Sequence, residues 1–444
     1  MPVDYVYRID QPHVSGQLAQ VCGTIAEGKG LIGDIETVTI GRDRSIREVN
    51  VEVRDHEQAE RLAGLLGELE DVRLITYFDR ALNRHTGGKL KIGGTFRMES
   101  LQDMRDVYTP GVARVCAAIA EDPSLASRLT MIGRTVAICT NGSRVLGLGD
   151  IGAVASMPVM EGKALFYNQM AGLSAMPILI DTHDVDEFVD TVLTIAPGFG
   201  AIHLEDIRAP DCFAIEARLI EALDVPVMHD DVHGTAVAAL AGALVACEQT
   251  GAELAAVTVG QLGLGAAGLG IATLMVAAGA KRVIASDPSR EAQERARAAG
   301  VEVVSFEQLM EAADIVVATT GVPDLIKPEV VRRGQVILAL TNPDPEIHPR
   351  EAERAGAAFA ADGAAVNNVL GFPGIFRGAL SVGAGAITTG MKLAAARAIS
   401  AATTASDLIA DPLDAHVHER VAEAVADAAL EEGVARPDHA PAGL

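Results

Sequence analysis

Four acidic residues stand in two adjacent pairs, and each pair directly follows a short apolar run. The pairs are Glu205–Asp206 and Asp230–Asp231. If the fold brings them together, their carboxylates repel one another strongly unless a cation or a lysine lies between them. Hard oxygen ligands without cysteine suit Mg²⁺ or Mn²⁺. The alternative is that each pair is solvated loop charge, but two pairs placed in the same way favour a metal site.

The segments around the two pairs read as strand, helix, strand, helix. Apolar runs at 199–204 and 225–228 predict the strands, and apolar residues at helical spacing predict helices over 211–223 and 235–248. This alternation predicts parallel strands, and ligands in open α/β sheets bind at the carboxyl ends of the strands. Both acidic pairs should therefore lie at one edge of a sheet.

A glycine-rich turn follows an apolar run at 256–262 and precedes a predicted helix. It fits G-x-G-x-x-G, in which glycines allow a tight turn and a close approach of the backbone to pyrophosphate. Asp287 ends the next predicted strand, roughly 20 residues on, where a ribose-binding carboxylate is expected. We therefore predict a Rossmann dinucleotide site rather than tight packing alone. Its expected cofactor-binding residues are Gly263, Gly265, Ala266, Ala267, Gly268 and Asp287.

In the segment before the acidic pairs, strands are predicted at 135–140 and 176–181. Asn141-Gly142 is a strong hairpin signal, so a return strand is expected over 144–148. One helix is expected to open within 108–113, and another to begin near Lys163.

The charge balance limits the partners of the chain. It carries 36 basic and 60 acidic residues, a formal net charge of −24. Nucleic acid and anionic membrane surfaces are therefore poor partners. Residues 254–280 carry no charge and are long enough to span a bilayer, but their glycines favour a buried parallel strand and a packed helix.

The length and the cysteines indicate a multidomain protein of the cytoplasm. A chain of 444 residues exceeds one ordinary core, so two or three domains are expected. Its five cysteines are scattered without a C-x-x-C motif, which fits buried thiols in a reducing compartment. No signal peptide is expected, because Asp4 and Arg8 interrupt the start of the chain.

Residues 1–85 are predicted to form a small α+β unit with the order βαββαβ, that of a ferredoxin-like split βαβ. This unit resembles the ACT domain, a small-ligand sensing or dimerising module. The resemblance places a small-molecule effector near the glycine-bearing stretch 28–34. A docking domain without a ligand is the equally weighted alternative. Residues 85–95, rich in Gly and Lys, are expected to form a linker.

The segment from Tyr108 to about Ala402 resembles the malic enzyme family. Eight blocks in the family's order carry the match: YTPGVA at Tyr108, RVLGLGDIG at Arg144, EGKAL around Lys163, LEDI around Glu205, HDDVHGT around Asp230, the glycine turn, TNPDPE around Asn342 and NNVLGFPGIFRGAL from Asn367. The resemblance implies an α/β catalytic domain over 96–235 and a Rossmann domain over 236–430. It also implies oxidative decarboxylation of malate to pyruvate and CO₂ with reduction of NAD or NADP. NAD is favoured because Asp287 would repel a 2′-phosphate, although Arg290 leaves NADP open.

The resemblance also implies a role for each site residue. Lys163 would be the base for the hydroxyl proton, Asp230 its partner, and Tyr108 the acid that protonates the enol of pyruvate. The remaining assignments are Glu205, Asp206 and Asp231 as metal ligands, Arg144 as a substrate-carboxylate ligand, and Asn342 and Asn368 as contacts to substrate or nicotinamide. Residue types agree, since such chemistry needs a base of lowered pKa and a cation that polarises the ketone.

Three alternatives remain open from the sequence. A malolactic-type reaction would yield lactate, and another Rossmann dehydrogenase would need no carboxylate triad. A non-catalytic nucleotide-binding regulator could use the ACT-like unit as its sensor. For all of them a homodimer or higher homo-oligomer is expected, most simply a dimer built around the Tyr108 segment.

Overall fold

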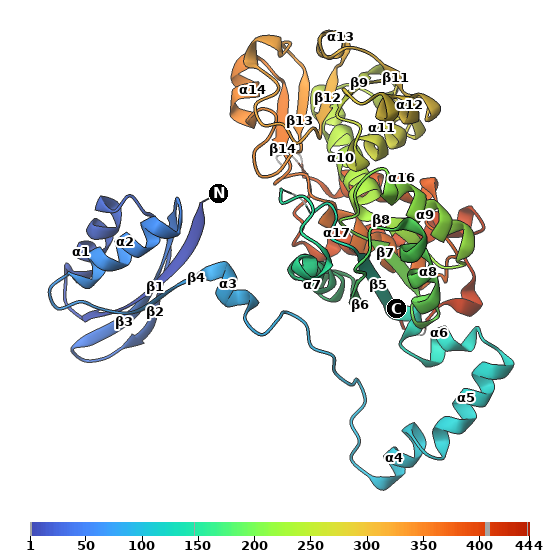
Figure 1. The fold of residues 1–444 in the computed structure, drawn as a ribbon, viewed down its shortest axis with the longest axis horizontal. Coiled ribbons are helices and arrows are strands. Elements are labelled where there is room, and N and C mark those ends of the chain that lie inside the picture. The colour runs from blue at the N-terminus through green and yellow to red at the C-terminus, as the bar shows by residue number, and fades with distance from the viewer. Residues whose placement is uncertain (1, 146, 405–408, 442) are drawn as a thin grey trace. The chain divides into compact units, whose positions relative to one another are not determined.

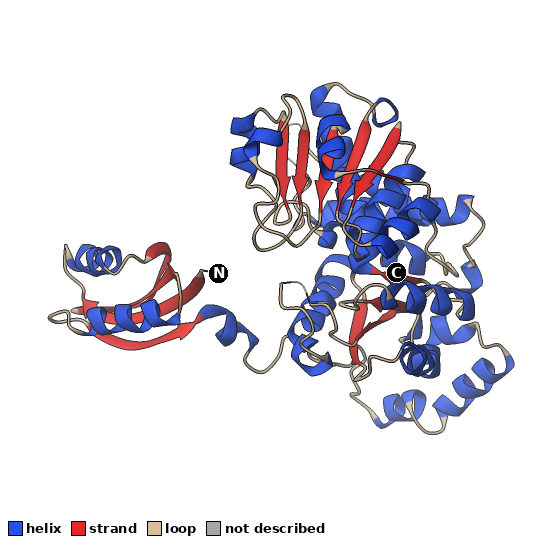
Figure 2. Cartoon of the chain, turned by 45° about the horizontal axis from the view of Figure 1, so that its top comes forward, coloured by secondary structure: helices blue, strands red, loops and turns tan. Residues whose placement is uncertain are grey.

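The structure is a computed structural model that describes residues 2–145, 147–404, 409–441 and 443–444 (Figure 1). The chain forms two compact units, Met1–Lys89 and Leu90–Leu444. The first is a small α+β unit, and the second contains two sheets and most of the helices (Figure 2).

The first unit is a four-stranded antiparallel sheet with two helices packed on one face. Its elements are β1 (Val3–Pro12), α1 (Gln17–Glu27), β2 (Leu31–Ile40), β3 (Arg44–Val53), α2 (His56–Gly67) and β4 (Arg73–Asp79), followed by α3 (Arg80–His85). The strand order is β2-β3-β1-β4. Alternate side chains such as Tyr7 and Val51 are buried against Ile25 and Leu62 of the helices, as the period of two requires. The predicted βαββαβ order is therefore confirmed.

The second unit begins with short helices that bury little. They are α4 (Leu101–Val107), α5 (Gly111–Glu121), α6 (Leu125–Leu129) and the 3₁₀ turn η1 (Ile132–Arg134). No residue of α4 is buried, and α5 buries only Gly111. The helix expected to open within 108–113 therefore begins at Gly111, while Tyr108 caps the end of α4.

The first sheet of this unit is parallel, as predicted. Its strands are β5 (Thr135–Thr140), β6 (Ser174–Leu179), β7 (Ala201–Leu204) and β8 (Val227–His229), in the order β6-β5-β7-β8. The crossover helices are α7 (Ala153–Ala171), α8 (Val185–Ile195) and α9 (Asp211–Ala222). Side chains of α8 and α9 pack on one face of the sheet, and α7 packs on the other.

The hairpin predicted at Asn141-Gly142 is wrong. Both edges of β5 are taken by β6 and β7, so no position is left for a return strand. The expected strand 144–148 is reduced to one isolated bridge between Val145 and Gly149, and Leu146 lies outside the described residues. Gly142 has a φ of 64°, and a Cβ there would overlap the carbonyl of Gly152 before α7. The turn therefore packs against a helix start.

The second sheet has six parallel strands in the order β11-β10-β9-β12-β13-β14, which is the Rossmann order. The strands are β9 (Thr258–Leu262), β10 (Arg282–Ser286), β11 (Glu302–Val303), β12 (Ile315–Ala318), β13 (Val336–Ala339) and β14 (Phe359–Asp362). Its helices are α11 (Ala266–Ala277), α12 (Arg290–Ala298), α13 (Phe306–Ala312) and α14 (Pro349–Ala355). The uncharged stretch 254–280 is thus β9 followed by α11, as predicted.

Four further helices join the two sheets into one core. They are α10 (Asp230–Thr250), α15 (Phe372–Ser381), α16 (Thr389–Ala402) and α17 (Ala415–Glu431). In the described chain, α10 is the one helix with the length and apolarity of a membrane span, but 78% of its apolar window is buried within the unit. It packs against α11 and α16, while α15 and α17 pack against α7. Such burial is that of a core helix.

Candidate active site

The two acidic pairs meet at one edge of the first sheet. β7 and β8 are parallel neighbours, with Leu204 opposite His229, so the residue after each strand emerges at the same level. Glu205 and Asp206 follow β7, whereas Asp230 and Asp231 form the first turn of α10. This helix begins at Asp230 rather than at the predicted position 235. Its amino terminus places a positive dipole end beside both carboxylates.

Three of the acids could hold one cation. Glu205, Asp206 and Asp231 each offer an oxygen, all within 4.8 Å of one another. Asp206 has a φ of 54°, a costly conformation for a residue other than glycine. Its amide donates to Asp231 Oδ2 at 3.0 Å, and its Oδ2 is buried with no partner among the described residues. An orphaned carboxylate oxygen in a set of hard oxygen donors fits Mg²⁺ or Mn²⁺.

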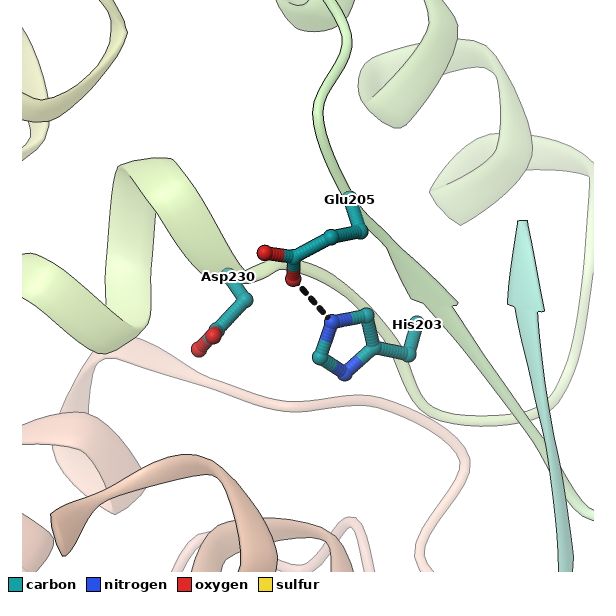
Figure 3. A group of neighbouring side chains, drawn as sticks. All are labelled: His203, Glu205 and Asp230. Atoms are coloured by element: carbon teal, nitrogen blue, oxygen red, sulfur yellow. Dashed lines mark hydrogen bonds and ion pairs between the residues drawn. The ribbon is translucent and has the colours of Figure 1, made fainter. Parts of the chain in front are cut away.

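In a second group of side chains, the positive charge comes from the Lys163 ammonium. His203, Glu205 and Asp230 also cluster closely enough to hold a metal ion, and Figure 3 shows them converging from β7 and α10. The Lys163 ammonium already lies between two of them, 2.5 Å from Asp230 Oδ2 and 3.2 Å from Glu205 Oε1. Lys163 stands in the middle of α7, not near its start as predicted, and is 8% exposed.

Burial and mutual repulsion set the ionisation of these groups. Burial raises the pKa of Glu205 to about 8, against the attraction of Lys163. Burial and the neighbouring carboxylates raise the pKa of Asp206 to about 9. Burial alone would lower the pKa of Lys163, but Asp230 and Glu205 raise it above its usual range. The lowered lysine pKa that we expect beside a divalent cation is thus opposed by the protein's own carboxylates.

His203 was not predicted as a site residue. Its Nε2 lies 2.6 Å from Glu205 Oε2, and its Nδ1 lies 2.8 Å from the Tyr167 hydroxyl. The ring is fully buried, edge-on to Tyr167 and Phe372 and stacked on Phe376. The only signal in the sequence was its position two residues before Glu205 in a strand, which places both side chains on one side of the chain.

A second buried network fixes the turn before Asp230. Glu216 of α9 accepts from the His229 amide at 2.7 Å and pairs with His233 Nε2 at 3.0 Å. Lys392 of α16 contacts His233 Nδ1 at 3.1 Å. These contacts tie three helices to the residues that carry Asp230, so the turn is rigidly placed.

The structure brings the expected substrate ligands to this region. The Arg144 amide donates to the Asp206 carbonyl at 3.0 Å, and its guanidinium has no hydrogen bond or ion pair with the described residues. Asn368 lies against Gly234 in the first turn of α10. Asn342 packs against Gly363 and, through its carbonyl, faces the loop at Gly147 that follows Arg144. Arg144 and Asn368 therefore contact the segments that carry the acidic pairs, whereas Asn342 is connected to them through the loop after Arg144.

Tyr108 is the exception. It ends α4, is 70% exposed, and makes no side-chain hydrogen bond with the described residues. Exposed apolar neighbours surround it in sequence: Phe96, Met98, Leu101, Met104 and Val107. Within a single chain the structure therefore does not bring Tyr108 into the buried cluster of Lys163 and Asp230.

The glycine turn has the geometry that a dinucleotide site requires. Gly263 has a φ of 83°, and a Cβ on Gly268 would overlap its carbonyl. Gly265 caps α11 and has open space where a Cβ would be, so a phosphate can approach the helix amino terminus. Ala266 and Ala267 form the first turn of α11. Asp287 follows β10 and accepts from the Leu264 amide at 2.7 Å, which places it beside the turn.

Gln261 is a polar residue inside the buried strand β9, and its hydrogen bonds explain its presence there. The side chain is fully buried, and its Nε2 donates to the Leu262 and Gly263 carbonyls and to Thr319 Oγ1 at 2.9–3.1 Å. These bonds brace the glycine turn against β12.

Two family models match the chain. "Malic enzyme, N-terminal domain" matches residues 95–220, and "D-isomer specific 2-hydroxyacid dehydrogenase, NAD binding domain" matches residues 233–324. The first therefore covers β5, β6 and β7 with the acidic pair Glu205–Asp206, and the second covers the glycine turn.

Relatives are similar over almost the whole chain. NAD-dependent malic enzyme 1 of Bacillus subtilis is 51% identical, over 95% of this chain and 97% of its own. An NAD-dependent malic enzyme of Geobacillus stearothermophilus is 40% identical, over 96% and 94%. The crystal structure of malic enzyme from Pyrococcus horikoshii aligns with a TM-score of 0.74 at 39% identity, over 79% of this chain and 88% of that one. The chain belongs to the malic enzyme family.

Proposed function

We propose that the protein oxidises malate and decarboxylates it to pyruvate and CO₂, with reduction of NAD. The observation that carries this proposal is the buried Lys163 between Asp230 and Glu205. It lies next to the acidic triad, in which each residue offers one oxygen to a cation. A lysine beside a cation site can remove a hydroxyl proton, and no carboxylate triad is needed for hydride transfer alone.

The order of steps follows from the residue positions. Arg144 binds a substrate carboxylate through its planar fork, and Lys163 accepts the hydroxyl proton while the hydride of that carbon passes to the nicotinamide. A divalent cation at Glu205, Asp206 and Asp231 would polarise the hydroxyl and ketone oxygens and stabilise the enolate left by CO₂. Its positive charge would also oppose the field that raises the pKa of Lys163. Tyr108 would then donate a proton to carbon.

NAD is the proposed cofactor. Two relatives are described as NAD-dependent, and Asp287 beside the glycine turn would bond a ribose 2′-hydroxyl and repel a 2′-phosphate. Arg290 begins α12 and is exposed, so NADP is the cofactor to compare. Asn342 and Asn368 are proposed to contact nicotinamide or substrate.

The decisive experiment is an assay of malate with Mn²⁺ and either NAD or NADP. Formation of NADH and pyruvate is expected, with the higher kcat/KM for NAD. Lactate without net NADH would instead indicate the malolactic-type reaction, and turnover that persists in EDTA would indicate a dehydrogenase without a metal site. Binding of NAD without conversion of malate would indicate a non-catalytic nucleotide-binding regulator.

The first unit is proposed to be an ACT-like module, and the domain limits 1–85, 96–235 and 236–430 go with this proposal. Two glycines of the stretch 28–34 have a packing role, because a Cβ on Gly28 would crowd Leu62 and one on Gly30 would crowd Val51. These contacts favour a docking module over an effector site at this stretch. An increase in Tm with a small-molecule metabolite, lost on deletion of residues 1–85, would support an effector-binding role for this unit instead.

A homo-oligomer, most simply a dimer, is proposed to complete the site. Tyr108 lies in an apolar segment that the described residues of its own chain leave exposed, whereas Lys163 lies in a buried cluster. A second copy that receives this segment would bury it and bring Tyr108 to the partner's Lys163.

The cytoplasm is the proposed compartment of the protein. The five unpaired cysteines suit its reducing conditions, although Cys116 is exposed rather than buried.

A further inference from the structure

The two oxygens of Glu205 have different neighbours. Oε2 lies 2.6 Å from His203 Nε2, and Oε1 lies 3.2 Å from Lys163 Nζ. The residue is 3% exposed, so solvent does not compete for either oxygen. Figure 3 shows the His203 ring directed at one oxygen of Glu205, while the other oxygen is turned away from the ring. One oxygen therefore faces a ring nitrogen, and the other faces the Lys163 ammonium beside Asp230.

The direction of the hydrogen bond follows from the chemistry of the groups. A Glu205 that binds a cation is ionised and can only accept, so His203 Nε2 must carry the hydrogen. Nδ1 is then the acceptor, and the Tyr167 hydroxyl donates to it across 2.8 Å. The chain of donors runs from Tyr167 through His203 to Glu205.

The aromatic surroundings prevent the ring from turning away. His203 is stacked on Phe376 at an interplanar angle of 23° and edge-on to Phe372 at 88°. Tyr167 is itself edge-on to both phenylalanines. Tyr167 also lies one helical turn after Lys163 on α7. The same helix therefore supplies the lysine beside Oε1 and the hydroxyl that contacts His203, the neighbour of Oε2.

We propose, on the basis of the cation site assigned under the proposed function, that His203 and Tyr167 are positioning residues that select the metal ion. They hold Oε2 away from the ion, so that Glu205 binds it through Oε1 alone. Ca²⁺ takes six to eight oxygens and accepts bidentate carboxylates, whereas Mg²⁺ demands near-octahedral geometry with single oxygens. The arrangement therefore favours Mg²⁺ or Mn²⁺ over Ca²⁺.

The test measures metal affinity without turnover. Mn²⁺ binding to the full chain is followed by the electron paramagnetic resonance signal of free Mn²⁺, and Ca²⁺ binding by competition. His203→Leu frees Oε2, so Mn²⁺ affinity should fall about 10- to 100-fold, as for other residues that orient a metal ligand. The affinity for Ca²⁺ should fall less, so the preference for Mn²⁺ over Ca²⁺ shrinks. His203→Gln, which keeps an N–H donor, should retain most of the preference.

Two further variants make the result decisive. Tyr167→Phe removes one oxygen atom from the chain of donors and should weaken Mn²⁺ binding several-fold, with the same loss of preference; it replaces His203→Leu should that variant not fold. Asp231→Asn tests the cation site itself. If Asp231→Asn loses Mn²⁺ binding but His203→Leu and Tyr167→Phe keep wild-type affinity and preference, the selection by His203 is refuted while the proposed function stands. If Asp231→Asn also binds Mn²⁺ normally, the cation site is refuted, and the selection proposal with it.

Discussion

Lys163 and Asp230 form a buried hydrogen bond of 2.5 Å across 67 residues of sequence. The lysine comes from the middle of α7 and the aspartate from the first residue of α10. Their contact holds the proposed base beside the three acids that could hold a cation.

Lys163→Ala should abolish malate oxidation. The variant lacks the proposed base, and such groups contribute about 100- to 10,000-fold to the rate. It also leaves Asp230 without its ion-pair partner, which should lower the free energy of unfolding by about 3–5 kcal/mol. Steady-state kinetics and urea unfolding measure the two effects. Lys281→Ala, at an exposed lysine, is the matched control and should change neither. Retention of full activity in Lys163→Ala would remove the lysine from the mechanism.

Asp231→Asn should lose metal-dependent turnover while it keeps dinucleotide affinity. The side chain belongs to the acidic triad, whereas the cofactor turn lies on a different loop after β9. Loss of a ligand should weaken Mn²⁺ binding by at least about 100-fold. Calorimetry with Mn²⁺ and fluorescence titration with NADH separate the two sites. Equal losses of both affinities would contradict the assignment.

Tyr108→Phe should slow pyruvate formation from both malate and oxaloacetate by about 100- to 10,000-fold. Decarboxylation of oxaloacetate needs no hydride transfer but still forms the enolate, so it isolates the proton donation. Full activity on both substrates would show that Tyr108 only packs.

Mixing two inactive variants tests whether Tyr108 acts on the partner's site. A dimer of one Tyr108→Phe chain and one Lys163→Ala chain contains one site with both residues intact, provided that each site takes its tyrosine from the other chain. Co-refolding the two should then restore activity in about a quarter of all sites. A mixture that stays inactive would show that each site uses its own tyrosine, and light scattering would report whether a dimer forms.

Gly234→Ala should disrupt the site, whereas Gly242→Ala should be tolerated. Both glycines lie in α10, but a Cβ on Gly234 would overlap Asp230 Oδ1, and one on Gly242 meets its nearest atoms at 3.7–3.8 Å. Displacing Asp230 should cost about 1–3 kcal/mol and most of the activity. Gly242→Ala should leave activity intact and stabilise the helix by about 0.5–1 kcal/mol. Unfolding curves and kinetics of the pair check this.

The stability of the metal-free protein should fall as the pH rises from about 5 to 9. The pKa values of Glu205 and Asp206 are raised in the folded state to about 8 and about 9, so the folded chain binds more protons than the unfolded chain in this window. Stability then decreases with pH until both groups are ionised in both states. A bound cation replaces these protons, so the rise in Tm caused by Mn²⁺ should be larger at pH 8.5 than at pH 6. A rise in Tm that does not depend on pH would show that these carboxylates do not bind the ion.

The sequence by itself determined those features of the protein that depend on residues close together in the chain. The parallel strands before Glu205 and Asp230 follow from short apolar runs between helical patterns, because parallel strands are buried on both faces. The glycine turn follows from backbone geometry that glycine tolerates, and Asp287 follows from its place at the end of the next strand. The first unit follows from strand and helix periods. In each case the deciding interactions span a few residues, or one strand and its neighbour.

Only the tertiary structure decided the contacts between distant segments and the charge state that they create. Asn141-Gly142 favours a hairpin locally, but β6 and β7 occupy both edges of β5. Nothing within ten residues of Lys163 shows that two carboxylates raise its pKa, since both lie more than 40 residues away in sequence. The role of His203 likewise depends on Tyr167 and on rings from α15, which packing brings together around one oxygen of Glu205. Desolvation and long-range pairing are properties of the assembled core, so no local pattern carries them.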